Sequence, residues 1–130
     1  MPDNNINLTD GEWNIMECLW EEAPRTVTQL AKYLKESVGW AKSTSITMVT
    51  RMEAKGLVYF KDGGKAKLYY PAVRREDAVR QETRNFLSKV YRGSVSLMMS
   101  AMVESQELSQ EEIDELYAIL EKAEEVKKGG

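Results

Sequence analysis

Several residue types that carry chemistry are scarce or missing in this chain of 130 residues. It has no histidine and one cysteine, so a zinc site has almost no ligands to draw on and an internal disulfide is impossible. No apolar run approaches the roughly 20 residues that cross a bilayer, and the opening MPDNNINLTD lacks the basic and apolar pattern of a signal peptide. These absences predict a cytoplasmic protein with no metal, no cofactor and no membrane insertion. Cys18 lies between Trp13 and Trp20, which favours a buried core thiol.

The same shortages argue against an enzyme. The chain has no histidine to act as a general base, and Gly63-Gly64 is not followed by the start of a helix, as a phosphate-binding loop would be. The acids gather within residues 111–115 and 121–125, a pattern typical of a solvated helix face. We therefore expect a protein that binds a partner and catalyses no reaction.

Charge is divided unevenly along the chain. Residues 1–24 contain six acids and no Lys or Arg, whereas residues 25–92 contain fifteen Lys or Arg and six acids. Residues 93–130 return to nine acids against three lysines, so the net charge of −3 hides a basic middle. A basic segment between acidic ends is the footprint of a surface that meets a polyanion. Charge alone leaves the alternative open, because any highly charged chain has uneven blocks.

Two helices are predicted before residue 40 by their start and stop signals. Thr9 with Glu12 fits a capping box, as does Thr26 with Gln29. Pro24 and Gly39 follow as stop signals. Apolar residues at helical spacing predict the inner faces, which are Trp13, Met16, Leu19 and Trp20 in the first helix and Leu30, Leu34 and Val38 in the second.

A third helix and a hairpin follow. The third helix spans about 42–55 and stops at Gly56. Segments 57–61 and 67–70 are rich in branched and aromatic residues and flank the turn signal Asp62-Gly63-Gly64. The order of helix, short strand, helix, helix and hairpin is that of a winged helix-turn-helix domain. This is a mainly α fold with a small β-hairpin wing, and its third helix enters the major groove of DNA.

The third helix is unusual because KSTSITMVTRMEAKG, residues 42–56, places five hydroxyl side chains within eight residues. Projection at 100° per residue puts Ser45, Met48, Val49 and Met52 on the core face. The opposite face carries Ser43, Ile46, Thr47, Thr50 and Ala54, with Arg51 at its edge. Hydroxyls bond phosphates or base edges, and an apolar group meets the thymine methyl.

Together these patterns predict a DNA-binding surface. The candidate DNA-binding residues are Lys42, Ser43, Thr44, Ile46, Thr47, Thr50, Arg51, Lys65 and Lys67. Lys61 adds a third lysine to the wing. An ordinary solvated helix and a lysine-rich hairpin that merely protects a sheet edge are the alternatives.

The C-terminal part predicts a dimer. Helices are expected over 75–91, 94–103 and 111–127, with Ser109 and Glu112 as a capping box for the last. The middle helix is apolar nearly all round, so it needs burial, and a second copy of the same segment would supply it through a two-fold interface. The candidate dimerisation residues are Val95, Leu97, Met98, Met99, Met102, Ile113, Leu116, Tyr117 and Leu120. A ligand pocket walled by Met98, Met99 and Met102 is the alternative.

Four segments in one order resemble the penicillinase repressor family, the winged-helix regulators of β-lactamase and methicillin-resistance genes. They are EWNIMECLW (12–20), STSITMVTRMEAKG (43–56), ETRNFLSKVYRG (82–93) and ELSQEEIDELYAIL (107–120). In the second segment, the residues in register are Thr44, Thr47, Thr50, Arg51, Lys55 and Gly56. The resemblance runs from about Leu8 to Glu121. It implies a homodimeric repressor that binds a palindromic operator in double-stranded DNA.

The chain departs from the family pattern at three places. Ile46 stands where the family commonly has a basic residue, which indicates a different base preference. Members cut by a membrane sensor protease have an Asn-Phe pair where this chain has Ala101 and Met102. The resemblance makes that pair the candidate cleavage region and such a protease a candidate partner, although the changed pair argues against this induction. The tail EKAEEVKKGG lacks the cysteine motif of the copper-responsive relatives, which argues against copper sensing.

The sequence therefore predicts a winged-helix DNA-binding domain over residues 1–73 and a helical dimerisation region over residues 74–130. The expected function is that of a homodimeric transcriptional repressor that reads its operator with the third helix and the wing. The alternative is a winged helix that binds another protein and has no sequence-specific affinity for DNA.

Overall fold

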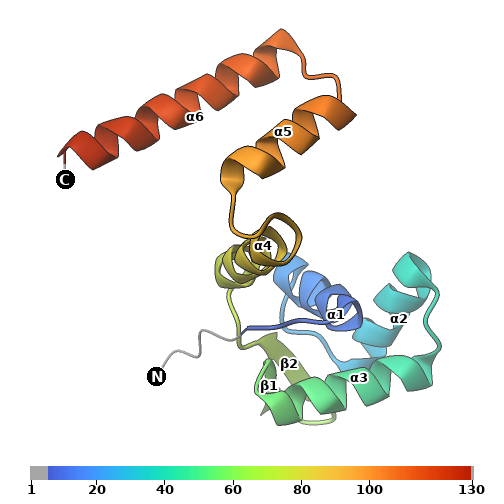
Figure 1. Ribbon diagram of the computed structural model, residues 1–130. Helices are drawn as coiled ribbons and strands as arrows, with labels where there is room; N and C mark the ends of the chain where they lie inside the picture. Colours follow the sequence, from blue (N-terminus) through green and yellow to red (C-terminus); the bar gives the residue numbers. More distant parts are fainter. Residues whose placement is uncertain (1–5, 130) are drawn as a thin grey trace. The chain divides into compact units, whose positions relative to one another are not determined.

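The computed structural model describes residues 6–129, which form six helices and one hairpin (Figure 1). The elements are α1 (Asp10–Glu21), α2 (Val27–Val38), α3 (Lys42–Lys55), β1 (Val58–Asp62), β2 (Lys67–Pro71), α4 (Arg75–Tyr91), α5 (Val95–Ser105) and α6 (Gln110–Gly129). The order of elements confirms the predicted fold class, and the elements from α3 to α6 lie within two residues of their predicted ends. The chain forms two compact units that meet after Asn85, within α4.

The ends of the first three helices follow the signals in the sequence. Glu12 N–H donates to Thr9 Oγ1 at 3.1 Å and Thr9 N–H donates to Glu12 Oε1 at 2.9 Å. Thr26 and Gln29 make the same reciprocal pair at the start of α2. Gly39 and Gly56 end α2 and α3 with φ of 75° and 80°, a region that glycine enters without steric cost. Both capping boxes and both glycine stops are confirmed.

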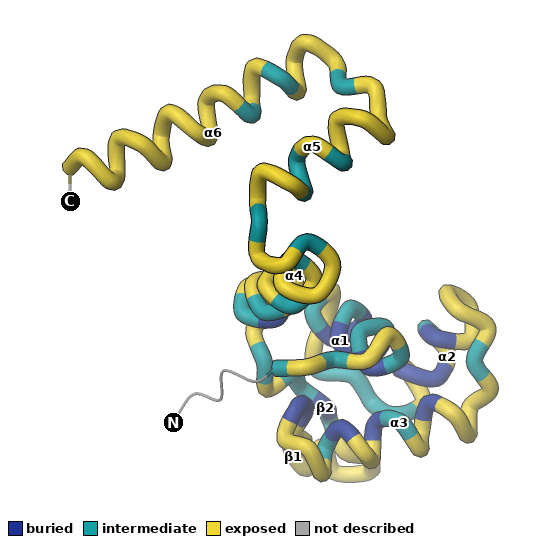
Figure 2. Tube along the Cα trace, viewed as in Figure 1, coloured by how far each residue is buried: buried dark blue, intermediate teal, exposed yellow. Residues whose placement is uncertain are grey.

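The core of the first unit is shared by α1, α2, α3 and the hairpin, whose buried positions are dark in Figure 2. Its largest buried side chains are Ile15, Met16, Leu19, Leu30, Leu34, Val49, Met52 and Val58. Cys18 is fully buried, and burial raises the pKa of its thiol to about 11, so the predicted inert core thiol is confirmed. The placement of Val38 on the inner face of α2 was wrong. That residue is 42% exposed because α2 ends there and the chain turns away at Gly39.

The hairpin is a two-stranded antiparallel sheet. Val58 pairs with Pro71 at its base and Asp62 with Lys67 at its tip. Gly63 is required in the connecting turn, since a Cβ there would lie 2.7 Å from the carbonyl oxygen of Ala66. The short strand expected before α2 is present as a single bridge, in which Arg25 and Tyr69 exchange N–H···O bonds of 3.1 and 2.9 Å. This bridge ties the hairpin to the chain between α1 and α2.

One ion pair joins the start of α1 to the end of α3. The Glu12 side chain is 3% exposed and accepts from Lys55 Nζ as well as from the N–H of Thr9. Burial by itself raises the pKa of this carboxyl. The Lys55 ammonium and the hydrogen bonds at Thr9 outweigh that effect and hold the pKa below its usual value. The ionised form of Glu12 is therefore part of the folded state.

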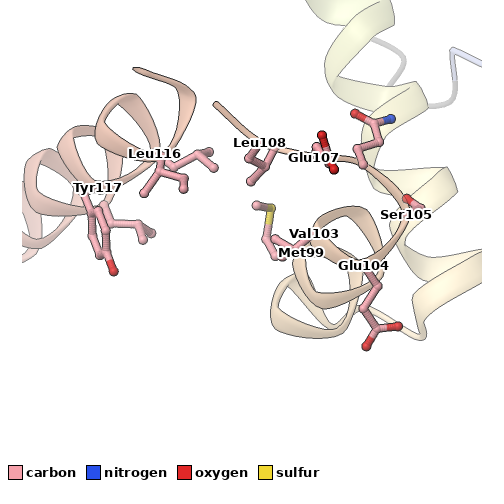
Figure 3. A pocket seen from close by; sticks show the side chains of 11 residues that line it. Met99, Val103, Glu104, Ser105, Glu107, Leu108, Leu116 and Tyr117 are labelled. Carbon is pink, nitrogen blue, oxygen red and sulfur yellow. The ribbon is translucent and has the colours of Figure 1, made fainter. Parts of the chain in front are cut away.

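The second unit contains α5 and α6, and Figure 2 shows no buried residue on either helix. Ser94 caps α5 by accepting from Leu97 N–H at 3.1 Å. The predicted pair of Ser109 and Glu112 caps α6, with Glu112 N–H donating to Ser109 Oγ at 3.1 Å. An apolar groove of about 700 Å³ lies between the two helices, lined by Met99, Val103, Leu108, Leu116 and Tyr117 among others (Figure 3).

The Glu12–Lys55 pair predicts a pH-dependent stability. A depressed carboxyl pKa contributes stability that is present above the unfolded-state pKa and is lost as the pH falls through the folded-state pKa. Glu12→Gln should lower the free energy of unfolding by about 1–3 kcal/mol at pH 7, with the difference from the wild type shrinking below about pH 4.5. Urea denaturation at pH 7 and pH 3.5 measures both values. The exposed Glu22→Gln is the control, and an equal loss for Glu12→Gln at both pH values would contradict the assignment.

Candidate nucleic-acid interface

The helix α3 presents two chemically distinct faces. Ser45, Val49 and Met52 are at most 1% exposed, and Met48 is half-buried beside them. The outward face is exposed over its whole length and consists of Lys42, Ser43, Thr44, Ile46, Thr47, Thr50, Arg51 and Ala54. The projection made from the sequence therefore sorts the residues of this helix correctly. The side chains proposed to meet DNA all lie on the solvent side.

A small residue on α1 lets α3 approach closely. A Cβ added at Gly11 would lie 3.1 Å from Met48 Cε and 3.5 Å from the ring of Trp40. Glycine thus leaves room for the side chains that seat the beginning of α3 on the core. Sequence reasoning missed this role, because a glycine in the first turn of a helix does not reveal its neighbours from another element.

The first turn of α3 is electropositive and uncapped. Ala41 occupies the N-cap position and supplies no side-chain oxygen, and the turn contains no acid. The backbone N–H groups at a helix start carry a partial positive charge and bind anions, phosphate included. Lys42, the first residue of the helix, adds a full charge at the same point. This end of α3 is suited to contact a phosphate.

The hydroxyls of α3 are not equivalent. Thr50 Oγ1 donates to the carbonyl oxygen of Ile46 at 2.8 Å, so its proton is committed within the helix and the oxygen is left as an acceptor. In the part of the chain that the structure describes, Ser43, Thr44 and Thr47 make no side-chain hydrogen bond within the protein. These three can donate to a phosphate, whereas Thr50 is suited to accept from a base amino group. The sequence could not separate these roles.

The wing carries three exposed lysines. Lys67 Nζ lies 4.2 Å from the centre of the Phe60 ring, and Lys61 Nζ lies 5.2 Å from that of Tyr70. Lys65 is at the exposed tip of the hairpin. Cation–π contacts hold the first two side chains against the strands while their charges remain exposed. Lys65 extends further from the sheet and has no such support.

The basic groups of this surface form no salt bridge within the described residues. Between residues 6 and 129, the salt bridges engage Lys55, Arg74, Arg75 and Arg80, and none engages Lys42, Arg51, Lys65 or Lys67. The carboxylate of Glu53 on α3 does not pair with these cations, because it accepts a hydrogen bond from Tyr69 Oη at 3.3 Å. The neighbouring Asp62 accepts from the N–H of Gly64 at 3.0 Å. Positive charge on α3 and on the wing therefore remains available to an anionic ligand.

The described residues offer little for other kinds of site. No three carboxylate or thiol side chains among them gather as ligands for a metal ion. Within the same residues, no helix has both the length and the apolar character needed to cross a membrane.

The proposed dimerisation residues on α5 and α6 are exposed or half-buried. Val95, Leu97 and Met102 are 43–56% exposed, and Tyr117 and Leu120 are 64% exposed. The remaining members, Met98, Met99, Ile113 and Leu116, are half-buried. Figure 3 shows Met99 and Leu116 facing the groove between them. In the candidate cleavage region, Ala101 is half-buried in α5.

Comparison with known proteins places this arrangement in a family. The model of a family described as "Penicillinase repressor" matches residues 8–122. The chain is 30% identical over 122 residues to the methicillin resistance regulatory protein MecI of Staphylococcus aureus strain N315, covering 94% of this chain and 99% of MecI. It is also 30% identical over 121 residues to the penicillinase repressor of Bacillus licheniformis, covering 93% of this chain and 94% of that protein.

Solved structures share the fold. The DNA binding domain of the repressor BlaI in solution superposes with a TM-score of 0.50 at 24% identity, covering 55% of this chain and 87% of that domain. The B. licheniformis BlaI monomer in complex with the blaP half-operator gives the same values. MepR, a transcription regulator of the S. aureus multidrug efflux pump MepA, superposes over 95% of this chain and 82% of its own with a TM-score of 0.50 at 18% identity. The helices, the hairpin and the matches over nearly the whole length agree: the chain belongs to the penicillinase repressor family.

Proposed function

We propose that this protein is a homodimeric transcriptional repressor that binds a palindromic operator in double-stranded DNA. The observation that carries the proposal is the outward face of α3, where hydroxyls, one exposed isoleucine and unpaired cationic groups lie together. Such a face is poorly suited to solvation alone, and it matches the mixture of phosphates, base edges and thymine methyls in a major groove. A DNA partner agrees with the cytoplasmic location expected from the sequence.

Each part of the chain has a role in this proposal. Residues 1–73 bind one half-site, with α3 in the major groove and the wing lysines Lys65 and Lys67 on phosphates. Residues 74–130 join two copies through the apolar side chains of α5 and α6, which a single copy leaves uncovered. The relatives that support this reading are the regulatory protein MecI and the BlaI repressor bound to a half-operator.

Induction would act on the second region. Ala101 and Met102 lie within the helix α5, and proteases bind their substrates in extended form, so cleavage there by a membrane sensor protease requires local unfolding of that helix. Removal of this region would leave the first unit with its own core intact. Loss of the dimer would then weaken operator binding without damaging α3.

Selection from a random duplex library tests the proposal. A repressor of this kind should enrich one sequence with two-fold symmetry, and fluorescence titration should show that affinity falls steeply with salt. If no duplex is bound at low salt, the winged helix serves as a protein-interaction module instead.

Arg51 generates the first prediction for DNA binding. If its exposed guanidinium contacts only a phosphate, Arg51→Ala should weaken binding to the selected operator and to an unrelated duplex by similar factors. The slope of log K against log salt should become less steep by about 2, about 1 for each copy of the dimer. Titration at four salt concentrations measures both effects, with Lys122→Ala in α6 as the control. A large loss confined to the operator would assign Arg51 to base readout.

Ile46 generates a prediction about specificity. It is 40% exposed near the start of α3, the end of a recognition helix that usually reaches the base edges. We expect an apolar contact with a thymine methyl, so replacing one thymine in each of the two half-sites by uracil should cost about 1.6 kcal/mol, roughly 15-fold, at about 0.8 kcal/mol for each methyl lost. Ile46→Ala should be insensitive to that replacement, as a double-mutant cycle requires. Equal binding at every uracil position would refute the contact.

Leu116 generates a prediction about assembly. Leu116→Asp would place a charge in the proposed interface, where an unpaired charge is expensive to desolvate. We expect monomers in analytical ultracentrifugation, a folded first unit by circular dichroism, and a collapse of operator affinity, because each half-site then binds separately. Ala118→Asp introduces the same charge at an exposed position outside the apolar stripe and is the matched control. A monomer that binds the operator as tightly as the wild type would exclude this coupling.

A further inference from the structure

A second basic feature lies beside the candidate interface and shares only Lys42 with it. It is a groove of about 600 Å³ between α2 and the turn that leads into α3. We call it the α2 groove and define it by Ala31, Lys32, Lys35, Gly39, Trp40 and Lys42. Figure 1 shows the turn between α2 and α3 that forms one side of it.

The α2 groove follows from the spacing of residues on α2. Residues 28, 31, 32 and 35 recur at helical intervals and share one face of the helix. Ala31 and Gly39 are small, and no atom lies within 4 Å of the position that a Cβ at Gly39 would take. Trp40 is half-buried and packs against the core, so it forms a fixed wall. The hollow is therefore a consequence of small residues beside one large anchored ring.

The rim of the α2 groove is cationic. Three exposed lysines line it, Lys32 and Lys35 from α2 and Lys42 from α3. No Asp or Glu is among the lining residues. Over the described span of the chain, none of these lysines takes part in a salt bridge. The nearest acid in sequence, Glu36, is not among the lining residues. Three uncompensated positive charges around one hollow favour an anionic occupant.

The lining also specifies what else the occupant contains. Its surface is mostly apolar, since it consists of lysine stems, alanine and the indole of Trp40. A free phosphate would leave that surface uncovered. The sugar–phosphate backbone of DNA has both parts, because deoxyribose presents apolar faces while each phosphate carries one negative charge. Lys42 belongs both to this groove and to the first turn of α3, so a strand that contacts that turn continues into the groove.

We propose that the α2 groove holds a stretch of the sugar–phosphate backbone next to the bases that α3 reads. This inference rests on the proposed DNA-binding function and extends it to Lys32, Lys35 and Trp40. The helix that precedes a recognition helix commonly crosses the backbone, and here that helix carries the two lysines on the required face. The α2 groove thereby fixes the register of α3 without reading a base.

The experiment compares two double variants of the full chain. K32Q/K35Q removes two charges from the α2 groove, and K122Q/K127Q removes two charges from α6 as a control. Thermal unfolding by circular dichroism confirms that each is folded. We expect the salt slope of K32Q/K35Q to become less steep by about 4, because each of the two copies loses two phosphate contacts and each lost contact removes about 1. The loss should be equal for the selected operator and for an unrelated duplex, and the control should bind like the wild type.

Methylphosphonate scanning locates the contact. Each phosphate of the operator is replaced in turn by an uncharged methylphosphonate. At one or two positions per half-site, this replacement should weaken binding of the wild type but leave the affinity of K32Q/K35Q unchanged. An unchanged salt slope for K32Q/K35Q, or a loss confined to the operator, would overturn the inference while leaving the proposed repressor function intact. If the wild type binds no duplex at all, both proposals fail together.

Discussion

The surface proposed to meet DNA depends on one constraint, which is that α3 is held through a single face. Serine and threonine are mediocre helix formers and Ala41 provides no cap, so local preference alone gives this helix little stability. Burial of Val49 and Met52 compensates, at about 1.5–3 kcal/mol for each large apolar side chain that is fully buried. Gly11 makes that packing close by leaving room for Met48 and Trp40. Because the buried residues of the inner face stabilise the helix, the residues of the outer face are not needed for packing.

The charged side chains of α3 are divided in the same way between those that stabilise the fold and those that remain unpaired. The ion pair between the buried Glu12 and the exposed Lys55 fastens the far end of α3 to α1, and the Glu53 carboxylate accepts a hydrogen bond from Tyr69. Glu12 and Glu53 are therefore engaged with structural partners, while Lys42 and Arg51 form no salt bridge among the described residues. With these two carboxylates engaged, the cationic groups of α3 remain available to a ligand. Electrostatic attraction to phosphates does not depend on the DNA sequence. The side chains that reach the bases must therefore distinguish one sequence from another.

The second unit is physically incomplete by itself. The first unit buries side chains from three helices and a hairpin in one core, whereas α5 and α6 have no buried residue. Two helices cannot cover an apolar surface that extends around both of them. The groove between them exposes Met99, Leu116 and Tyr117 to solvent in the single copy (Figure 3). Such a unit is expected to gain its stability from association with another apolar surface.

The sequence alone determined the helices, their caps and the two faces of α3. These features depend on hydrogen bonds and side-chain directions within four residues, as Thr9 with Glu12 and the glycine stops illustrate. Tertiary structure decided what no local pattern contains. It exposed Val38 at the end of α2, joined Glu12 to Lys55 across 43 residues, and brought Trp40 beside Ala31 to form the α2 groove. Contacts of that kind arise from how whole elements pack, and packing depends on the shapes of surfaces that are distant in the chain.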